Sequence, residues 1–268
     1  MVYHWLDYGG LDIRDEVHLA FCIILLGLLG SALCIPRGAA SADEWSRAYG
    51  GPDDDSLLCV ITTTDGGYAL TGSTNSSGAG GYDAWFVKTD SSGNVTWEKT
   101  YGGPGSDSMS HVIQLANGEY ALAGHTSGEA WLVSTDSSGN VQWDKTYKDL
   151  NLRSLIQTSD GGYVLAGTTL VGYENGLLVK TDSSGNVQWN KTYGGAGIGL
   201  LFVNSVIQTG DGGYALACQV VSLGFGFGLL LKTDSSGNMQ WNKTYGEARG
   251  YNDLSSVIET ADGGYALA

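Results

Sequence analysis

The chain has 268 residues, of which 42 are glycine and 15% are charged. Its hydrophobic fraction of 42% is large enough for a packed core, which argues against intrinsic disorder. With 13 basic and 28 acidic residues the formal net charge is −15. We therefore expect no nucleic-acid partner, because neutralising phosphates requires an excess of Lys and Arg.

The N-terminal segment 1–42 differs from the rest of the chain. It has an acidic lead and then an apolar run of seventeen residues, 19–35, followed by small residues up to Ala42. We expect the run to form a hydrophobic helix that acts as a secretory signal peptide, cleaved before Asp43. The alternative is a retained membrane anchor, for which seventeen residues are close to the minimum length. Both interpretations place residues 43–268 outside the cell or on its surface.

From residue 43 onward the sequence is a repeat. Tryptophans recur at intervals of 46 or 52 residues, and each interval contains D-G-G-Y or its variant N-G-E-Y at Asn117. Such internal periodicity outranks other signals in a sequence. Counted from tryptophan, four complete units and part of a fifth are visible, with their anchors at Trp45, Trp97, Trp143, Trp189 and Trp241.

Each unit contains four strand-like segments, which are clear in the unit that begins around Trp143. The first segment, 141–147, alternates apolar and polar residues, and the second is the short run 154–158. The third, 163–167, is reached through D-G-G, which suits a tight hairpin. The fourth, 176–180, is almost entirely apolar, as expected for a strand covered on both faces. D-S-S-G-N then leads to the next unit.

A four-stranded antiparallel unit of this length, repeated head to tail, is typical of a β-propeller blade. Solenoids have shorter or helical repeats and fit less well. We therefore predict an all-β propeller with four complete blades and a partial fifth over residues 43–268. The repeat stops within a unit at Ala268, so we expect a longer repeat protein, or self-association through open blade edges.

The two ends of such a propeller differ in sequence. D-G-G and D-S-S-G-N lie at one end and hardly change between units, so we interpret their aspartates as turn-forming anchors. These anchors are Asp90, Asp136, Asp182 and Asp234. The connections at the other end vary in length and content. Recognition usually sits on variable loops of a fixed scaffold, although sequence drift gives the same pattern.

Aromatic residues outside the repeat pattern are the best candidates for binding, because exposed aromatics often mark carbohydrate or protein contacts. They are Tyr82, Tyr173, Phe202, Phe225, Phe227 and Tyr251. Four N-x-S/T sequons are candidate glycan acceptors in an exported protein. They are Asn75, Asn94, Asn190 and Asn242.

We find no sequence motif for metal, phosphate or cofactor binding. The acidic run 53–55 lacks the alternating spacing of a calcium loop, and the Cys and His spacings do not suit zinc. His111 and His125 flank one hairpin and are expected to be surface residues. We therefore predict no metal site and no cofactor.

The unit W-x-K-T-Y-G-G, S-V-I-Q-T-x-D-G-G-Y-A-L-A-G, L-V-K-T-D-S-S-G-N resembles the repeat of secreted or surface-attached propeller proteins of archaea and bacteria. The resemblance covers about residues 43–268. It implies an exported, non-catalytic propeller that serves as an extracellular interaction or surface-structure module. Its partner would be an extracellular protein or a carbohydrate.

Two enzyme families offer the alternative of a propeller enzyme with its site on the variable end. The run Asp182, Gly185, Trp189 is similar to the repeated joint of quinoprotein dehydrogenases, but has one residue fewer between Asp and Gly. Sialidase joints have a closer Asp and Gly, and these glycan-active enzymes also need an arginine cluster. Arg47, Arg153 and Arg249 occupy unrelated repeat positions, so neither family's site carries over.

Overall fold

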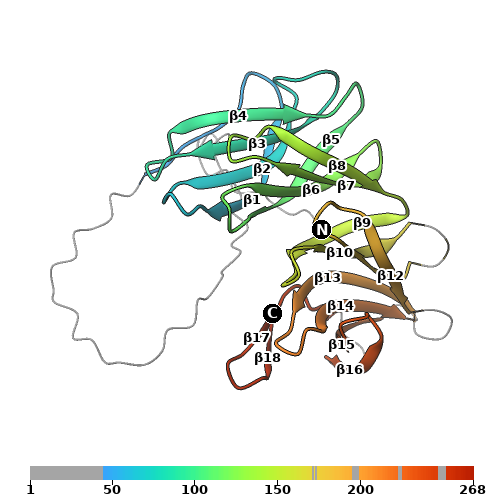
Figure 1. Ribbon diagram of the computed structural model, residues 1–268. Helices are drawn as coiled ribbons and strands as arrows, with labels where there is room; N and C mark the ends of the chain where they lie inside the picture. Colours follow the sequence, from blue (N-terminus) through green and yellow to red (C-terminus); the bar gives the residue numbers. More distant parts are fainter. Residues whose placement is uncertain (1–44, 171, 173, 195–198, 223–224, 247–251) are drawn as a thin grey trace, which may run out of the picture.

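The computed structural model describes residues 45–170, 172, 174–194, 199–222, 225–246 and 252–268. Their regular structure consists of β-strands (Figure 1). The apolar run 19–35 and the expected N-terminal helix lie outside the described residues, as do Tyr173 and Tyr251. Within the described part of the chain, no helix has the length and apolarity needed to cross a membrane.

The strands form five antiparallel sheets of consecutive strands, which we call blades 1 to 5. Blade 1 contains β1 (Asp55–Thr62), β2 (Tyr68–Thr74), β3 (Asp83–Thr89) and β4 (Val95–Tyr101). Blade 2 contains β5 (Asp107–Gln114), β6 (Tyr120–Thr126), β7 (Glu129–Thr135) and β8 (Val141–Tyr147). Blade 3 contains β9 (Leu150–Gln157), β10 (Tyr163–Thr169), β11 (Gly176–Thr181) and β12 (Val187–Tyr193). Blade 4 contains β13 (Leu200–Gln208), β14 (Tyr214–Ser222), β15 (Phe225–Thr233) and β16 (Met239–Tyr245). Blade 5 has two strands, β17 (Val257–Glu259) and β18 (Tyr265–Leu267).

The blades are packed face to face as in a propeller. In Figure 1 they follow one another in chain order, from blade 1 at the top to blade 5 at the bottom. The first strands of neighbouring blades lie close to one another, whereas the fourth strands are largely exposed to solvent. We call them the inner and outer strands. This arrangement confirms the predicted all-β propeller with four complete blades and a partial fifth.

The structure differs from the sequence analysis in where each blade begins. The segment that contains tryptophan and K-T-Y is the outer, fourth strand of a blade and not its first strand. D-S-S-G-N closes the hairpin between the third and fourth strands, because the Asp136 amide donates to the carbonyl of Asn140 at 2.9 Å. A repeat is circular, so its period alone does not identify the first strand. Both conserved turns still lie at the same end of the propeller.

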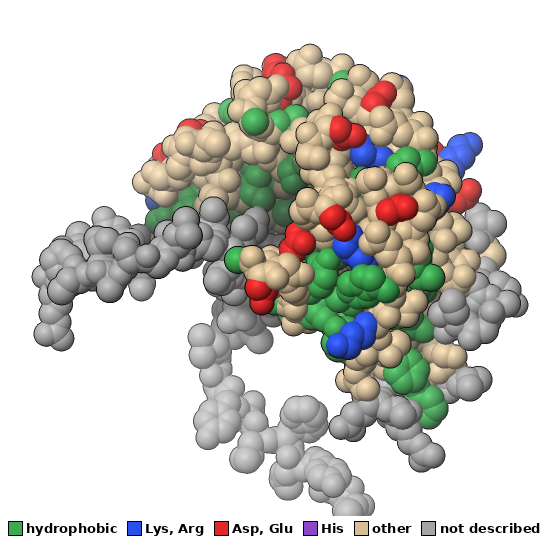
Figure 2. Space-filling model, turned by 60° about the horizontal axis from the view of Figure 1, so that its bottom comes forward, with side chains coloured by type: hydrophobic (Ala, Val, Ile, Leu, Met, Phe, Trp, Pro, Cys, Tyr) green, Lys and Arg blue, Asp and Glu red, His purple; other side chains and the backbone are tan. Residues whose placement is uncertain are grey.

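The hydrophobic core lies in the seams between blades. In the seam of blades 2 and 3, for example, Leu132 and Tyr147 of blade 2 pack against Leu152 and Leu165 of blade 3. The last seam is only partly covered, because blade 5 is small. Ile207 and Tyr245 of blade 4 and Leu267 of blade 5 stay partly exposed there. Figure 2 turns this side of the molecule forward and shows hydrophobic side chains gathered at the surface.

The residues that recur in the repeat bridge neighbouring blades. Trp143 of the outer strand β8 lies edge-on against Tyr163 of blade 3, with ring centroids 6.0 Å apart. Tyr147, on the same strand, donates its hydroxyl to the carbonyl of Gly185 in the next blade at 2.7 Å. Equivalent pairs occur between blades 1 and 2 and between blades 3 and 4. The recurring tryptophans and tyrosines of the repeat therefore serve mainly to attach one blade to the next.

Candidate functional site

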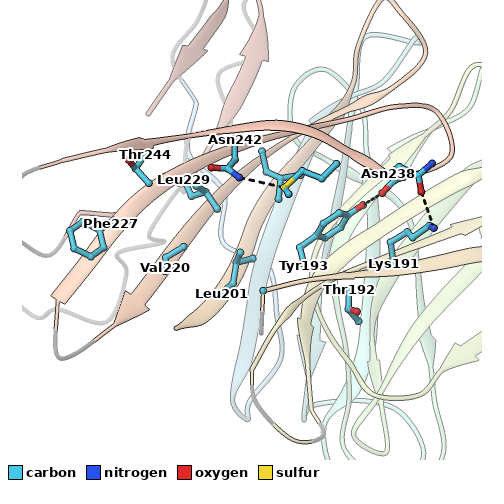
Figure 3. Close-up of a pocket in the computed structure, with 14 residues that line it drawn as sticks. Lys191, Thr192, Tyr193, Leu201, Val220, Phe227, Leu229, Asn238, Asn242 and Thr244 are labelled. Carbon is cyan, nitrogen blue, oxygen red and sulfur yellow. Dashed lines mark hydrogen bonds between the residues drawn. The ribbon is translucent and has the colours of Figure 1, made fainter. Parts of the chain in front are cut away.

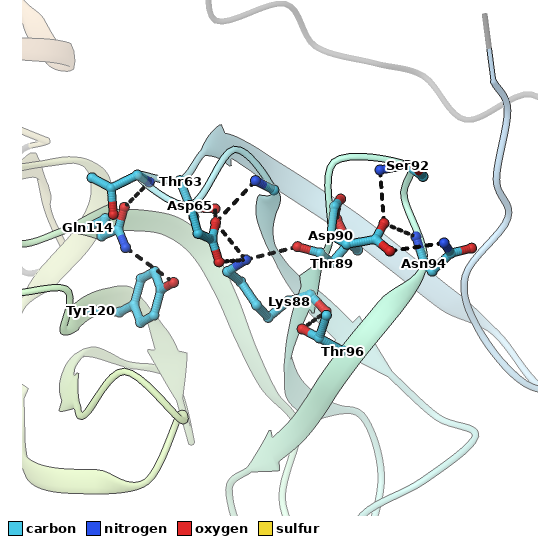
Figure 4. Close-up of polar contacts among 12 residues, drawn as sticks. Thr63, Asp65, Lys88, Thr89, Asp90, Ser92, Asn94, Thr96, Gln114 and Tyr120 are labelled. Carbon is cyan, nitrogen blue, oxygen red and sulfur yellow. Dashed lines mark hydrogen bonds and ion pairs between the residues drawn. The ribbon is translucent and has the colours of Figure 1, made fainter. Parts of the chain in front are cut away.

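At one end of the propeller, which we call the repeated end, the aspartates bond within their own turns. Figure 4 shows Asp90 receiving the Ser92 amide at 2.8 Å and both the Asn94 amide and side chain at 2.9 and 3.0 Å. The hydrogen bonds from Asn94, first from its side chain and then from its backbone, hold the pKa of Asp90 below its usual range. The same contacts recur at Asp136, Asp182 and Asp234.

The D-G-G turns at this end are also internally satisfied. In Figure 4 the buried Lys88 reaches Asp65, whose carboxylate further accepts from Thr63 and from the Gly67 amide. The hydrogen bond from Lys88, followed by the one from Thr63, places the pKa of Asp65 well below its usual range. Carboxylates used in this way organise turns, so the repeated end has a structural role.

Each inner strand carries a β-bulge at the same place, which in blades 1 to 4 is the middle of the strand. One residue is skipped in the pairing with the second strand, and it is Leu58 in β1, Ser110 in β5, Arg153 in β9 and Asn204 in β13. In blade 5 the amides of Ser255 and Ser256 both donate to the carbonyl of Ala268, at 2.7 and 3.2 Å. Bulges re-aim side chains and are common beside functional sites. Here one repeated distortion presents a different residue in each blade.

The bulges of blades 2 and 3 bring together two histidines and an arginine. The Ser110 hydroxyl lies 2.9 Å from Nδ1 of His111, whose ring also has a backbone hydrogen bond with Arg153. The Leu152 amide donates to Nε2 of His125 at 3.2 Å, so this nitrogen is unprotonated. Burial lowers the pKa of both histidines. The expectation of two surface histidines is therefore wrong: both line the seam between blades 2 and 3 and are partly buried.

This cluster combines neutral imidazoles with one exposed guanidinium, that of Arg153. The hydrogen bonds of His111 with Arg153 and of His125 with Leu152 join the two blades, so the histidines first serve to hold the seam together. The exposed Arg153 adds a positive group on the inner strands of an acidic protein, which suits a polar or anionic ligand group. Across the described ranges, no group of three or more His, Cys, Asp or Glu side chains is arranged to hold a metal ion.

The structure separates the aromatic residues that the sequence analysis selected. Tyr82 precedes β3 in blade 1, is 38% exposed, and directs its hydroxyl to Asp54 at 3.4 Å. Phe202, Phe225 and Phe227 all belong to blade 4 and are partly buried. The pairing of Phe227 with Val220 and Leu201 puts Phe202 on the opposite face of the sheet. These four side chains therefore do not form one binding surface.

Phe227 instead lines a groove in the seam between blades 3 and 4. The groove has a volume of about 660 Å³ and most of its exposed wall is apolar. Figure 3 shows Leu201, Val220 and Leu229 among its apolar residues. Phe227 lies towards one end of it, and Lys191 and Asn238 lie towards the other. No sequence motif pointed to this groove, because its walls come from five strands of two blades.

The sequons lie at the surface. All four asparagines are exposed, and Asn190 and Asn242 lie on the outer strands β12 and β16. The side-chain amide of Asn94 is engaged with Asp90, whereas Asn75 follows β2 at the variable end. Asn242 also lines the groove between blades 3 and 4.

No family model and no curated protein matches this sequence. Among solved structures, the chain is similar to the β-propeller domain of the Trilobed protease from Pyrococcus furiosus, which has an open velcro topology. That likeness has a TM-score of 0.43 and 14% identity, and covers 72% of this chain and 57% of that chain. A crystal structure of the eukaryotic initiation factor gives 0.43 and 11%, covering 77% and 47%. The tail fiber of Staphylococcus aureus phage P68 gives 0.36 and 14%, covering 80% and 42%. The chain spans about half the length of these structures.

Proposed function

We propose that this protein is an exported, non-catalytic β-propeller of the secreted or surface-attached kind, and that it binds an extracellular protein or carbohydrate through its inner strands and the variable end beside them. The observation that carries the proposal is the bulge in each inner strand. The same backbone distortion recurs in blades 1 to 4 and presents Leu58, Ser110, Arg153 and Asn204.

The contrast between the two ends supports this function. Aspartates at the repeated end are engaged within their own turns, which leaves that end little capacity to select a ligand. The inner strands instead offer an exposed apolar residue, Leu58, and an exposed cation, Arg153, and the variable end offers the exposed aromatic Tyr82. Such a mixture on a rigid scaffold suits recognition better than it suits a purely structural surface.

Binding is tested with purified protein on a glycan array and on extracellular proteins from the host. The variant Leu58→Ser, Tyr82→Ser, Arg153→Ala removes two exposed groups of the inner strands and one of the variable end. The matched control Ser91→Ala, Ser137→Ala, Ser183→Ala alters three exposed serines of the D-S-S-G-N turns at the repeated end. We expect the first variant to lose binding by about tenfold or more and the control to bind normally. Equal binding by the two variants, or no ligand for the parent protein, contradicts the proposal.

Export is tested separately by determining the N-terminus of the protein recovered from the host. A chain that begins at Asp43 in the medium supports a cleaved signal peptide. A chain that keeps residues 19–35 in the membrane fraction supports the anchor. Recovery of the uncleaved chain from the cytoplasm contradicts export.

A further inference from the structure

The groove between blades 3 and 4 has a counterpart that is filled elsewhere in the same protein. In the seam between blades 1 and 2, the indole of Trp131 lies among the core residues and donates to Asp144 at 3.0 Å. In blade 4 the corresponding positions of β15 and β16 hold Leu229 and Asn242. Leu229 is smaller than the Trp131 indole, and Asn242 lacks the charge of Asp144. Both Leu229 and Asn242 line the groove.

Blade 3 shows why this replacement alone does not define the groove. It has the same pair, Leu177 and Asn190, facing blade 2. There, however, the third strand is preceded by Asn175, whose backbone amide donates to the Thr169 hydroxyl at 3.0 Å. In blade 4 the equivalent positions are Phe227 and Val220, contributed by the longer strands β14 and β15. At these two positions the seam between blades 2 and 3 is therefore polar, and the seam between blades 3 and 4 is apolar.

The groove is long and apolar. It extends beside β16 from the turn at Asn238 to Thr244 and on to Phe227, with Leu201, Val220 and Leu229 in its walls. A strand of this length spans roughly 20 Å, so the groove matches an extended chain better than a compact ring. Apolar ligand sites usually add a few polar groups that fix the ligand's orientation.

Its charge is positive at one end. Lys191 is the charged side chain among the residues that line the groove, and its Nζ donates to the Asn238 side chain at 3.1 Å. No Asp or Glu is among these lining residues, although the protein carries a net charge of −15. The residue is half-buried, but the hydrogen bond of its ammonium is exposed, and the ammonium keeps further protons to donate. One cation at the end of an apolar groove complements one anionic group at the end of an apolar chain.

We propose that this groove binds a fatty acid, with its acyl chain along Leu201, Leu229 and Phe227 and its carboxylate at Lys191. The groove reaches the variable end at Phe227, but it contains none of Leu58, Tyr82 and Arg153, so it is tested independently of the proposed function.

The test uses calorimetry of the purified protein with dodecanoate and with dodecanol. The variant Leu229→Trp, Asn242→Asp copies the pair that fills the seam of blades 1 and 2 and should abolish binding. Its control, Leu177→Trp, Asn190→Asp, makes the same changes in blade 3 and should bind dodecanoate like the parent. Lys191→Gln should weaken dodecanoate about tenfold and leave dodecanol unchanged, because a charge-assisted hydrogen bond is lost.

The proposal is overturned if the parent protein does not bind dodecanoate, if both double variants behave alike, or if Lys191→Gln affects the acid and the alcohol equally. Should Leu229→Trp, Asn242→Asp fail to fold, a photoreactive dodecanoate is cross-linked to the unaltered protein. Labelling of β15, β16 or Lys191 supports the site, and labelling confined to other strands contradicts it.

Discussion

Lys88 and Asp65 form an ion pair with 2.8 Å between Nζ and Oδ2, although Lys88 is only 5% exposed. The same pair recurs in blades 3 and 4. In blade 2 both partners differ together, because Ser134 replaces the lysine and Asn117 replaces the aspartate. The two residues thus vary together. Blades 1, 3 and 4 have both the buried lysine and the aspartate that pairs with it, and blade 2 has neither.

Blade 3 tests this relationship by a double-mutant cycle on Lys180 and Asp160. Asp160→Asn alone leaves the buried ammonium without its carboxylate and should lower the free energy of unfolding by about 1–2 kcal/mol, since the aspartate side is half-exposed. The double variant Lys180→Ser, Asp160→Asn copies blade 2 and should cost less than the sum of the two single variants. Urea unfolding measures all four proteins. Strict additivity would show that the two residues act independently.

Acid should destabilise the protein through the same carboxylates. The hydrogen bond from Thr158, together with those from Lys180 and the Gly162 amide, lowers the pKa of Asp160 to about 2 from its ordinary 3.8. A depressed pKa means that the unfolded chain binds the proton first, so this contribution is present above about pH 4 and lost as the pH falls towards 2. The melting temperature should drop across that interval. Asp160→Asn should reduce the drop, and an identical acid profile would refute this assignment.

The histidine seam predicts a second, higher pH window. Burial lowers the pKa of His111 and His125 from 6.5. The neighbouring His125 also lowers the pKa of His111, and the neighbouring Arg153 also lowers the pKa of His125. Below about pH 6.5 the unfolded chain takes up protons that the folded seam resists, so stability should fall as the pH decreases. Protonated Nε2 of His125 can no longer accept the Leu152 amide.

The measurement is urea unfolding at several pH values between about 8 and 5. His125→Gln keeps a side-chain acceptor for the Leu152 amide and cannot titrate, so its stability should change less over this range. A variant with the parent's full pH dependence would place the titrating group elsewhere.

Two glycines with similar backbones should respond differently to alanine. Gly185 has φ 76° and an added Cβ would lie 2.6 Å from the Trp143 ring, whereas Gly161 has φ 82° and open space around the same position. Gly161→Ala should cost about 1 kcal/mol of left-handed strain. Gly185→Ala should cost clearly more, because the tryptophan contact between blades must also shift. Thermal unfolding of both variants decides this, and equal losses would contradict a role for close packing.

The sequence predicts the propeller because its periodicity, hairpin residues and tryptophans are local signals. It does not identify the outer strand, since a circular repeat has no intrinsic beginning. The bulges at Ser110 and Arg153 are also hidden, because a skipped residue is visible only when two strands are paired. The histidine seam depends on a contact between His125 and Leu152, which belong to different blades.

In the candidate sites, too, single residues can be recognised from the sequence, whereas their arrangement depends on contacts between blades. Tyr82 and Phe227 stand out from the repeat, but their distance from each other depends on blade order. The groove becomes recognisable only when Leu229 is compared with Trp131 at the same strand position, and when the depth of a seam is known.

The bridges from Trp143 and Tyr147 to the next blade have a consequence for how such a chain evolves. The outer strands β4, β8 and β12 carry the donor half of this joint, and blades 2, 3 and 4 offer the receiving half in their Tyr and their turn glycine. A tandem duplication of one unit therefore copies both halves of a compatible joint. Blades can be gained or lost as whole genetic cassettes, while the bulge residues diverge freely within each copy.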